Sequence, residues 1–212
     1  MDPILLPYYV LMSISFGIST FCIKGSTKNI YLFLLLLISI LIETSVQYLV
    51  YFKQNHFILY HFFTPVEYCL LSLYCYRTTQ LKTVQRVILI SIILFFILAV
   101  FTINDDTLLN FPSVTNGIES LMLIVLSTII LLNIEPITKV HIYAIPEFWI
   151  ALSILIYFTG TFFFNGAYNF LKNSNSVNIK DLFTIINTIF NCLFYLLLSY
   201  GLICYYRFKK YN

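Results

Sequence analysis

Charged residues are scarce in this chain. Of its 212 residues, 10% are charged, whereas 60% are hydrophobic and 18% are aromatic. A soluble domain typically has about 25% charged residues, because water must solvate its surface. The composition therefore excludes a soluble enzyme, a nucleic-acid-binding module and a disordered linker, and it indicates an integral membrane protein.

Motifs for metal binding and catalysis are also absent. The five cysteines form no Cys-x-x-Cys pair, and His56 and His61 do not belong to a zinc-binding pattern. There is no Gly-x-Ser-x-Gly sequence, His-rich cluster or Asp-rich motif of the kind a lipid-processing enzyme would use. We therefore predict no catalytic residues, no metal and no cofactor, and we favour a non-enzymatic function without a nucleic-acid partner.

Long apolar runs occupy most of the chain. A spanning helix needs about 20 mostly apolar residues, because the hydrocarbon core is about 30 Å thick and the helix rises about 1.5 Å per residue. The apolar runs do not alternate in polarity as the strands of a membrane barrel would. We predict an all-α polytopic membrane protein, a single seven-helix transmembrane domain over residues 1–212, with spans at about 4–24, 29–52, 56–76, 84–103, 114–133, 146–169 and 182–206.

The first span is expected to stay in the mature protein. A cleaved signal peptide begins with a basic segment and has a short apolar region. Here the chain begins with the acidic segment Met1-Asp2-Pro3, and the apolar run that follows is long enough to span a membrane. We therefore count it among the seven helices.

Basic residues are distributed unevenly among the predicted loops. If the N-terminus lies outside, three of the twelve Lys and Arg residues (Lys53, Lys172 and Lys180) fall on the outer side, and the other nine fall inside. Cytoplasmic loops of membrane proteins are enriched in Lys and Arg. We therefore predict a multi-pass protein of the cell (inner) membrane with its N-terminus outside, its C-terminus in the cytoplasm and the lipid bilayer as its surroundings.

Three glutamates, Glu43, Glu67 and Glu119, lie within predicted spans, and no Lys or Arg lies at comparable depth. Charged groups in the bilayer are costly, so they usually face protein or water and often serve function. One interpretation is ordinary hydrogen bonding between helices by neutral glutamates. The other, which we favour, is a polar pocket that opens to the outer side and binds a proton, a cation or a polar ligand. Its candidate residues are Glu43, Gln47, His61, Glu67, Glu119, Tyr157, Asn187 and Asn191.

Small and aromatic residues give two weaker predictions for the first span. Ser13, Gly17 and Thr20 lie at helical spacing on one face, which favours close packing against another helix. Tyr8 and Tyr9 fall near the predicted membrane surface, where tyrosines often form an aromatic belt.

Two short matches suggest an internal repeat. Residues 39–42 and 153–156 both read Ser-Ile-Leu-Ile, and residues 74–77 resemble residues 204–207. These positions fit two parallel three-helix units joined by the fourth span. That span, 84–103, has almost no polar group and is the best candidate for a peripheral, lipid-facing helix.

One segment carries a resemblance to known proteins. It reads PEFWIA at Pro146–Ala151 and LIYFTGTFFF at Leu155–Phe164. It resembles a segment that recurs in multispan bacterial membrane proteins, including membrane regions attached to sensor histidine kinases. The 212 residues contain no kinase domain, so the resemblance implies a stand-alone sensory or accessory module that acts through a membrane or cytoplasmic protein partner.

Three functions therefore remain open. The first is a receptor-like or signalling-associated sensory module with the glutamate-containing outer pocket. The second is a small proton- or cation-coupled transporter, which the repeat and the glutamates would favour. The third is a structural subunit of a membrane complex. A retinal protein is not expected, because the last predicted span, 182–206, contains no lysine for a Schiff base.

Overall fold

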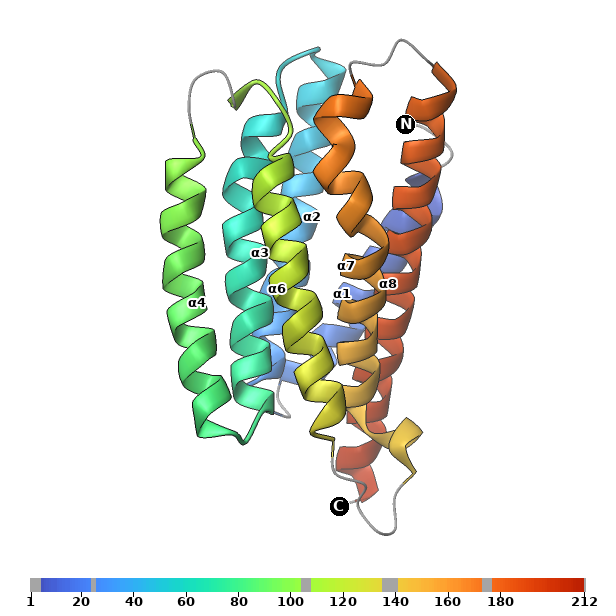
Figure 1. Cartoon of the computed structure of the whole chain (residues 1–212). Coiled ribbons are helices and arrows are strands. Elements are labelled where there is room, and N and C mark those ends of the chain that lie inside the picture. The colour runs from blue at the N-terminus through green and yellow to red at the C-terminus, as the bar shows by residue number, and fades with distance from the viewer. Residues whose placement is uncertain (1–4, 24–25, 104–107, 135–140, 173–176, 212) are drawn as a thin grey trace.

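The computed structural model describes residues 5–23, 26–103, 108–134, 141–172 and 177–211, with the side chains of 165–183 and 208–211 left undescribed. Within these residues the fold is all-α, as predicted. A short 3-10 helix, η3 (Ile142–Ala144), precedes α7. The long helices, shown in Figure 1, are α1 (Leu6–Cys22), α2 (Asn29–Tyr51), α3 (Phe57–Thr78), α4 (Lys82–Phe101), α6 (Ser113–Leu132), α7 (Pro146–Lys172) and α8 (Val177–Tyr211).

Five of the helices are long and apolar enough to cross a membrane, namely α2, α4, α6, α7 and α8. α1 is apolar but shorter, with 17 residues. α3 has 22 residues, and its interior carries His61, Pro65 and Glu67, which make it less apolar than the five. The helices thus fit a multi-pass membrane protein. α8 begins before the predicted span 182–206 and extends beyond it.

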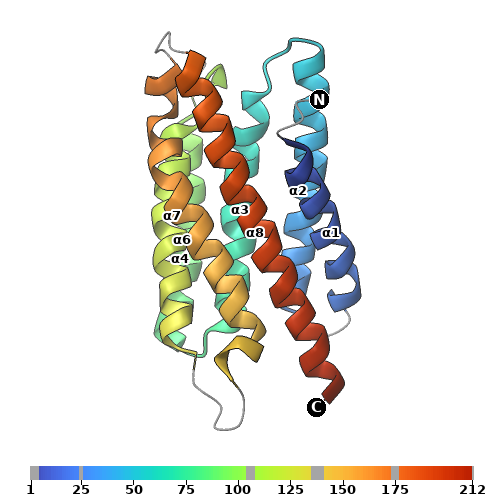
Figure 2. The same ribbon diagram turned by 90° about the vertical axis from the view of Figure 1, so that its right-hand side faces the viewer.

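Six of the helices form a ring. Each packs against the next in the order α1, α2, α3, α6, α7, α8 and back to α1, and α3 also packs against α4. In Figures 1 and 2, α2 ends and α3 begins at the upper end, whereas α8 ends at the lower end. The ring therefore has a central interior that all six helices can reach.

α4 lies outside this ring. It packs against α3 and, less extensively, against α6, and Figure 1 shows it at the edge of the bundle. Much of its surface is apolar and exposed in the isolated chain, reaching 81% at Phe101. The prediction of a peripheral fourth helix is confirmed. Along the sequence, α4 separates the three ring helices α1–α3 from the three ring helices α6–α8. This order is the one that the predicted repeat requires, and the repeat itself stays a prediction.

One face of α1 packs against α8. The buried residues of α1 are three or four positions apart, which places them on a single face: Tyr8, Met12, Ser15, Ser19 and Cys22. The Ser15 hydroxyl lies 2.7 Å from the Ser199 hydroxyl and also donates to the Tyr195 carbonyl at 3.0 Å. Small side chains at this contact allow the two backbones to approach closely.

The predicted small face of α1 is wrong. Ser13 and Thr20 are exposed, and their hydroxyls bond to carbonyls of their own helix. A Cβ atom on Gly17 would meet nothing within 4 Å. The packed face is instead the one that begins with Tyr8. Its buried residues recur every three or four positions and include both large and small side chains, so small size alone does not identify the packed face.

The turn between α2 and α3 is closed by a Schellman arrangement. Lys53 has a φ of 56°, and the Gln54 N–H donates to the Leu49 carbonyl at 2.9 Å while the Lys53 N–H donates to the Val50 carbonyl at 3.0 Å. These bonds satisfy carbonyls that the end of α2 would otherwise leave unpaired. The turn places the start of α3 at the upper end of the ring.

The lower half of the ring is closely packed. Large apolar residues from four helices are fully buried there, including Leu36, Leu71, Leu123 and Ile150. A Cβ atom on Gly201 of α8 would lie 2.8 Å from Cγ1 of Ile150 and 3.2 Å from the Pro146 carbonyl oxygen, so the two backbones nearly touch.

An ion pair crosses the lower end of the ring. The Lys28 ammonium group, at the start of α2, bonds to the Glu147 carboxyl group in the first turn of α7. Their side chains are only 19% and 20% exposed. Since α2 and α7 are not ring neighbours, this pair ties together two helices on different sides of the interior.

Candidate ligand-binding site

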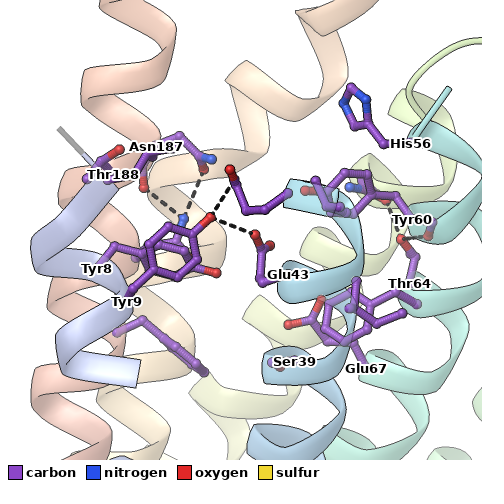
Figure 3. Close-up of a pocket in the computed structure, with 18 of the residues that line it drawn as sticks. Tyr8, Tyr9, Ser39, Glu43, His56, Tyr60, Thr64, Glu67, Asn187 and Thr188 are labelled. Atoms are coloured by element: carbon purple, nitrogen blue, oxygen red, sulfur yellow. Dashed lines mark hydrogen bonds between the residues drawn. The ribbon is translucent and has the colours of Figure 1, made fainter. Parts of the chain in front are cut away.

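A cavity of about 260 Å³ occupies the upper half of the ring interior. Residues from all six ring helices line it, and none comes from α4. It reaches the upper end, where His56 and Phe57 at the start of α3 and Phe111 just before α6 form part of its wall. Figure 3 shows its lining side chains, which converge from helices far apart in the sequence.

A chain of polar groups holds Glu43 on the α2 side of the cavity. The Tyr9 hydroxyl donates to Oε2 of Glu43 at 3.4 Å, and Nε2 of Gln47 donates to the Tyr9 hydroxyl at 2.7 Å (Figure 3). Tyr8 and Tyr60 also lie against this carboxyl group. Glu43 and Gln47 are one helical turn apart, so the same face of α2 presents both to α1.

Glu67 of α3 lies deeper, between two other carboxyl groups. It interacts electrostatically with Glu43, and Glu119 of α6 interacts with Glu67. Glu119 is 2% exposed, and its Oε1 has no hydrogen-bond partner among the described residues. Tyr157 of α7 interacts with all three groups. The three glutamates are therefore neighbours in the fold.

Amide and hydroxyl groups form other parts of the wall. Thr64 of α3 donates to Oδ1 of Asn116 on α6 at 2.7 Å. On α8, Nδ2 of Asn191 bonds to the Asn187 carbonyl at 2.9 Å and to its Oδ1 at 3.3 Å. These groups offer both donors and acceptors to a molecule in the cavity.

Six of the eight predicted site residues line this cavity: Glu43, Gln47, Glu67, Tyr157, Asn187 and Asn191. The other two do not. Glu119 is buried behind Glu67. His61 lies 3.1 Å, by Nε2, from the Asn110 carbonyl and lines a second cavity beside Pro112 and Ser113. His61 points away from this cavity, whereas His56 lines it. The two residues are five positions apart and therefore lie on different faces of α3.

The contribution of α1 to the cavity was not predicted from the sequence. Tyr8 and Tyr9 were expected in an aromatic belt at the membrane surface, but Tyr8 is buried and both line the cavity. The signal that could have identified Tyr8 is its spacing from Met12 and Ser15, which continues the buried face of the helix.

The cavity wall contains the carboxyl groups of Glu43 and Glu67, and it includes His56 at its upper end. Among the described lining residues there is no Lys or Arg. Nor does the described part of the chain contain a group of three or more His, Cys, Asp or Glu side chains that could hold a metal ion. The arrangement offers an interior of carboxyl, amide and hydroxyl groups that can form hydrogen bonds with a bound molecule.

No family model, curated protein or solved structure matches the chain. The resemblance of residues 146–164 to bacterial sensory regions therefore stays a prediction, and the cavity is the main structural evidence on function.

Proposed function

We propose that the protein is a receptor-like sensory module of the bacterial cell membrane that binds a small polar ligand from the outer side. The observation that carries this proposal is the cavity, where Glu43 and Glu67 face a shared space with the amides of Gln47 and Asn191. Carboxyl groups inside a membrane are costly, so an accessible cavity around them favours a functional role.

The ring supports seven spans rather than five. α1 lies between α2 and α8, and α3 lies between α2 and α6, so both pack beside helices that are long enough to cross a membrane. A short or less apolar helix is stable in the bilayer when its polar groups face other helices. α3 fits this description, because Glu67 faces the cavity.

The positions of basic residues support an outer location for the cavity. Lys28, Arg77 and Arg207 lie at the lower end of the ring, where α2 begins and where α3 and α8 end. Cytoplasmic loops are enriched in such residues. The upper end, with the cavity, then faces outside.

The tryptophan provides a test of signalling. Trp149 is the single tryptophan of the chain. It lies in the first turn of α7 at the lower end, with its ring centroid 4.6 Å from that of Tyr200. A sensory module must transmit ligand binding from the upper cavity to this end.

We expect ligands of the cavity to change Trp149 fluorescence in the full chain reconstituted in lipid nanodiscs. The screen uses cationic, neutral and anionic small molecules, and Tyr200→Leu serves as the control that removes the nearby ring. A ligand that requires Glu67 and shifts the emission supports the sensory function. A ligand that requires Glu67 but leaves the emission unchanged contradicts transmission, and the absence of any Glu67-dependent ligand contradicts the pocket.

A carrier is the second candidate, because the ion pair of Lys28 and Glu147 favours it. A carrier open on one side must be closed on the other, and this pair joins α2 to α7 below the cavity. Uptake of a cavity ligand into sealed proteoliposomes, increased by a proton gradient, would support transport. Binding without uptake would favour the sensory module.

A further inference from the structure

Two groups of aromatic rings line the cavity. Tyr9, Tyr8, Tyr195, Phe194 and Tyr157 form one continuous group, with successive ring centroids 4.7, 5.6, 5.2 and 5.0 Å apart. The second group, nearer the upper end, consists of Phe57, Phe111 and Tyr60, with Phe111 6.4 Å from Phe57 and 6.0 Å from Tyr60. All eight residues are part of the cavity wall.

The carboxyl groups lie between these two aromatic groups. Figure 3 shows Glu43 between Tyr8 and Tyr9 on one side and Tyr60 on the other, with Glu67 below it. The faces of aromatic rings carry negative potential and attract organic cations. A cation placed beside Glu43 would therefore meet a carboxyl group and ring faces together.

Glu119 adds an independent observation. It is almost completely buried, its Oε1 has no partner among the described residues, and its carboxyl group is near enough to that of Glu67 to interact with it electrostatically. A buried acceptor of this kind is costly unless a proton or a positive charge compensates it. No described Lys or Arg lines the cavity, and His56, the described histidine of its wall, lies at the upper end, so a ligand next to Glu67 can supply the compensating charge.

A metal ion is a poor match for this space. Calcium and magnesium bind to several oxygen ligands at about 2.0–2.6 Å, whereas much of this wall is aromatic carbon. The volume of about 260 Å³ is also far larger than a bare ion occupies, and it lies just below the range of about 300–1,000 Å³ that is usual for ligand pockets. The space suits a small organic molecule.

We propose that the cavity binds a small organic cation, a primary amine or a quaternary ammonium compound. Its charged group lies beside Glu43 and Glu67, its apolar body lies between the two aromatic groups, and its polar substituents reach Asn187 and Asn191. This inference rests on the proposed function of the cavity and adds the chemical class of the ligand.

Paired probes test this proposal. The two cations are choline and tyramine, and their neutral counterparts are 3,3-dimethyl-1-butanol and tyrosol, which keep the shape and lack the charge. Binding is measured by calorimetry on the full chain in nanodiscs. We expect at least one cation to bind about tenfold or more tightly than its neutral counterpart, as a desolvated cation beside rings and carboxyl groups should.

Variants locate the charge preference within the cavity. Glu43→Gln and Glu67→Gln are each expected to reduce the affinity for the cation about tenfold while changing that for the neutral probe less than about threefold. Tyr157→Leu is expected to weaken both probes, because it removes part of the wall. Glu147→Gln, measured at a temperature where it is folded, is the matched carboxyl control at the opposite end and should leave both affinities unchanged.

The outcomes separate this inference from the proposed function. If charged and neutral probes bind with equal affinity, and Tyr157→Leu abolishes the binding of both, the proposed preference for cations is overturned. The proposal that the cavity binds a ligand would then still stand. Cation binding that Glu43→Gln and Glu67→Gln leave unchanged overturns the assignment to this site. Failure of both cations to bind overturns the organic-cation class, whatever the neutral probes do.

Discussion

The carboxyl groups in the two halves of the helix ring have different surroundings. In the upper half, Glu43, Glu67 and Glu119 lie near one another beside a cavity that no described Lys or Arg lines. In the lower half, the Glu147 carboxyl group is paired with Lys28, and the surrounding interior is packed. The same small protein thus contains an acid that is paired with a lysine and acids that have no Lys or Arg partner among the described residues.

This difference separates a structural role from a binding role. A paired acid at the lower end connects two helices, and its removal leaves a charge behind. The acids beside the cavity have no Lys or Arg partner among the described residues, so replacing one of them leaves no unpaired cation behind and should cost the fold less. Their expected contribution is to ligand binding. Substitutions in the lower half should therefore change mainly the stability of the protein, and substitutions of the cavity acids should change mainly its affinity for a ligand.

The largest effect on stability is expected from Glu147→Gln. This substitution leaves the Lys28 side chain, which is about four-fifths buried, without its partner. We expect a loss of about 2–3 kcal/mol, less than for a fully buried pair because water still reaches both groups. Denaturant unfolding in mixed micelles measures it. The double variant Lys28→Met/Glu147→Leu should recover most of the loss, and equal losses in both variants would contradict the ion-pair explanation.

Gly201→Ala tests the close packing of the lower half. The added methyl group would approach the Ile150 side chain and the Pro146 carbonyl, and overpacking of this kind costs about 1–2 kcal/mol. Gly117→Ala, in the upper part of α6, is the matched control, since nothing lies within 4 Å of its Cβ position. It should be neutral or slightly stabilising. Equal effects at Gly201 and Gly117 would show that the halves are packed alike, and a smaller loss at Gly201 would show that the lower half is the looser one.

Glu119→Gln should have little effect on stability, in contrast to Glu147→Gln. The amide has almost the same shape as the carboxyl group, and Oε1 of Glu119 has no described partner to lose. We expect the free energy of unfolding to change by less than about 1 kcal/mol. The change should be towards stabilisation, because a buried carboxyl group is removed. A loss of stability as large as that of Glu147→Gln would show that the Glu119 carboxyl group forms a hydrogen bond that stabilises the fold.

The smallest effect is expected at the contact of α1 with α8. Ser15→Ala removes hydrogen bonds to Ser199 and to the Tyr195 carbonyl. Such bonds between membrane helices contribute about 0.6 kcal/mol on average. Ser13→Ala, on the exposed side of the same helix, should change the free energy of unfolding less. Equal effects at the two serines would contradict the packed face described for α1.

Several of these features were predictable from the sequence. Long apolar runs identified the helices, and the lack of polar groups in 84–103 identified α4 as peripheral. Polar residues at helical spacing identified six residues of the cavity wall. These predictions succeed because periodicity along one helix reports which of its faces is polar.

Other features depend on how the helices meet. The pairing of Lys28 with Glu147 joins residues 119 positions apart, and no local pattern indicates it. Tyr9 contributes to the cavity only because α1 packs beside α2, where its hydroxyl reaches Glu43 and Gln47. His61 was misplaced because it lies on a different face of α3 from His56, and the structure that this face meets beside Pro112 and Ser113 could not be predicted.

The central claim is that the cavity opens to the outside while the lower end is closed. Cysteine accessibility tests it directly, in a variant whose five native cysteines are replaced by serine or alanine. Gln47→Cys on α2 and Asn191→Cys on α8 line the cavity, whereas Ser127→Cys lies in the packed interior. A membrane-impermeant cationic thiol reagent should label the first two only when added outside, and it should not label Ser127→Cys from either side. Labelling of the cavity positions from the cytoplasmic side alone, or from neither side, would contradict the account.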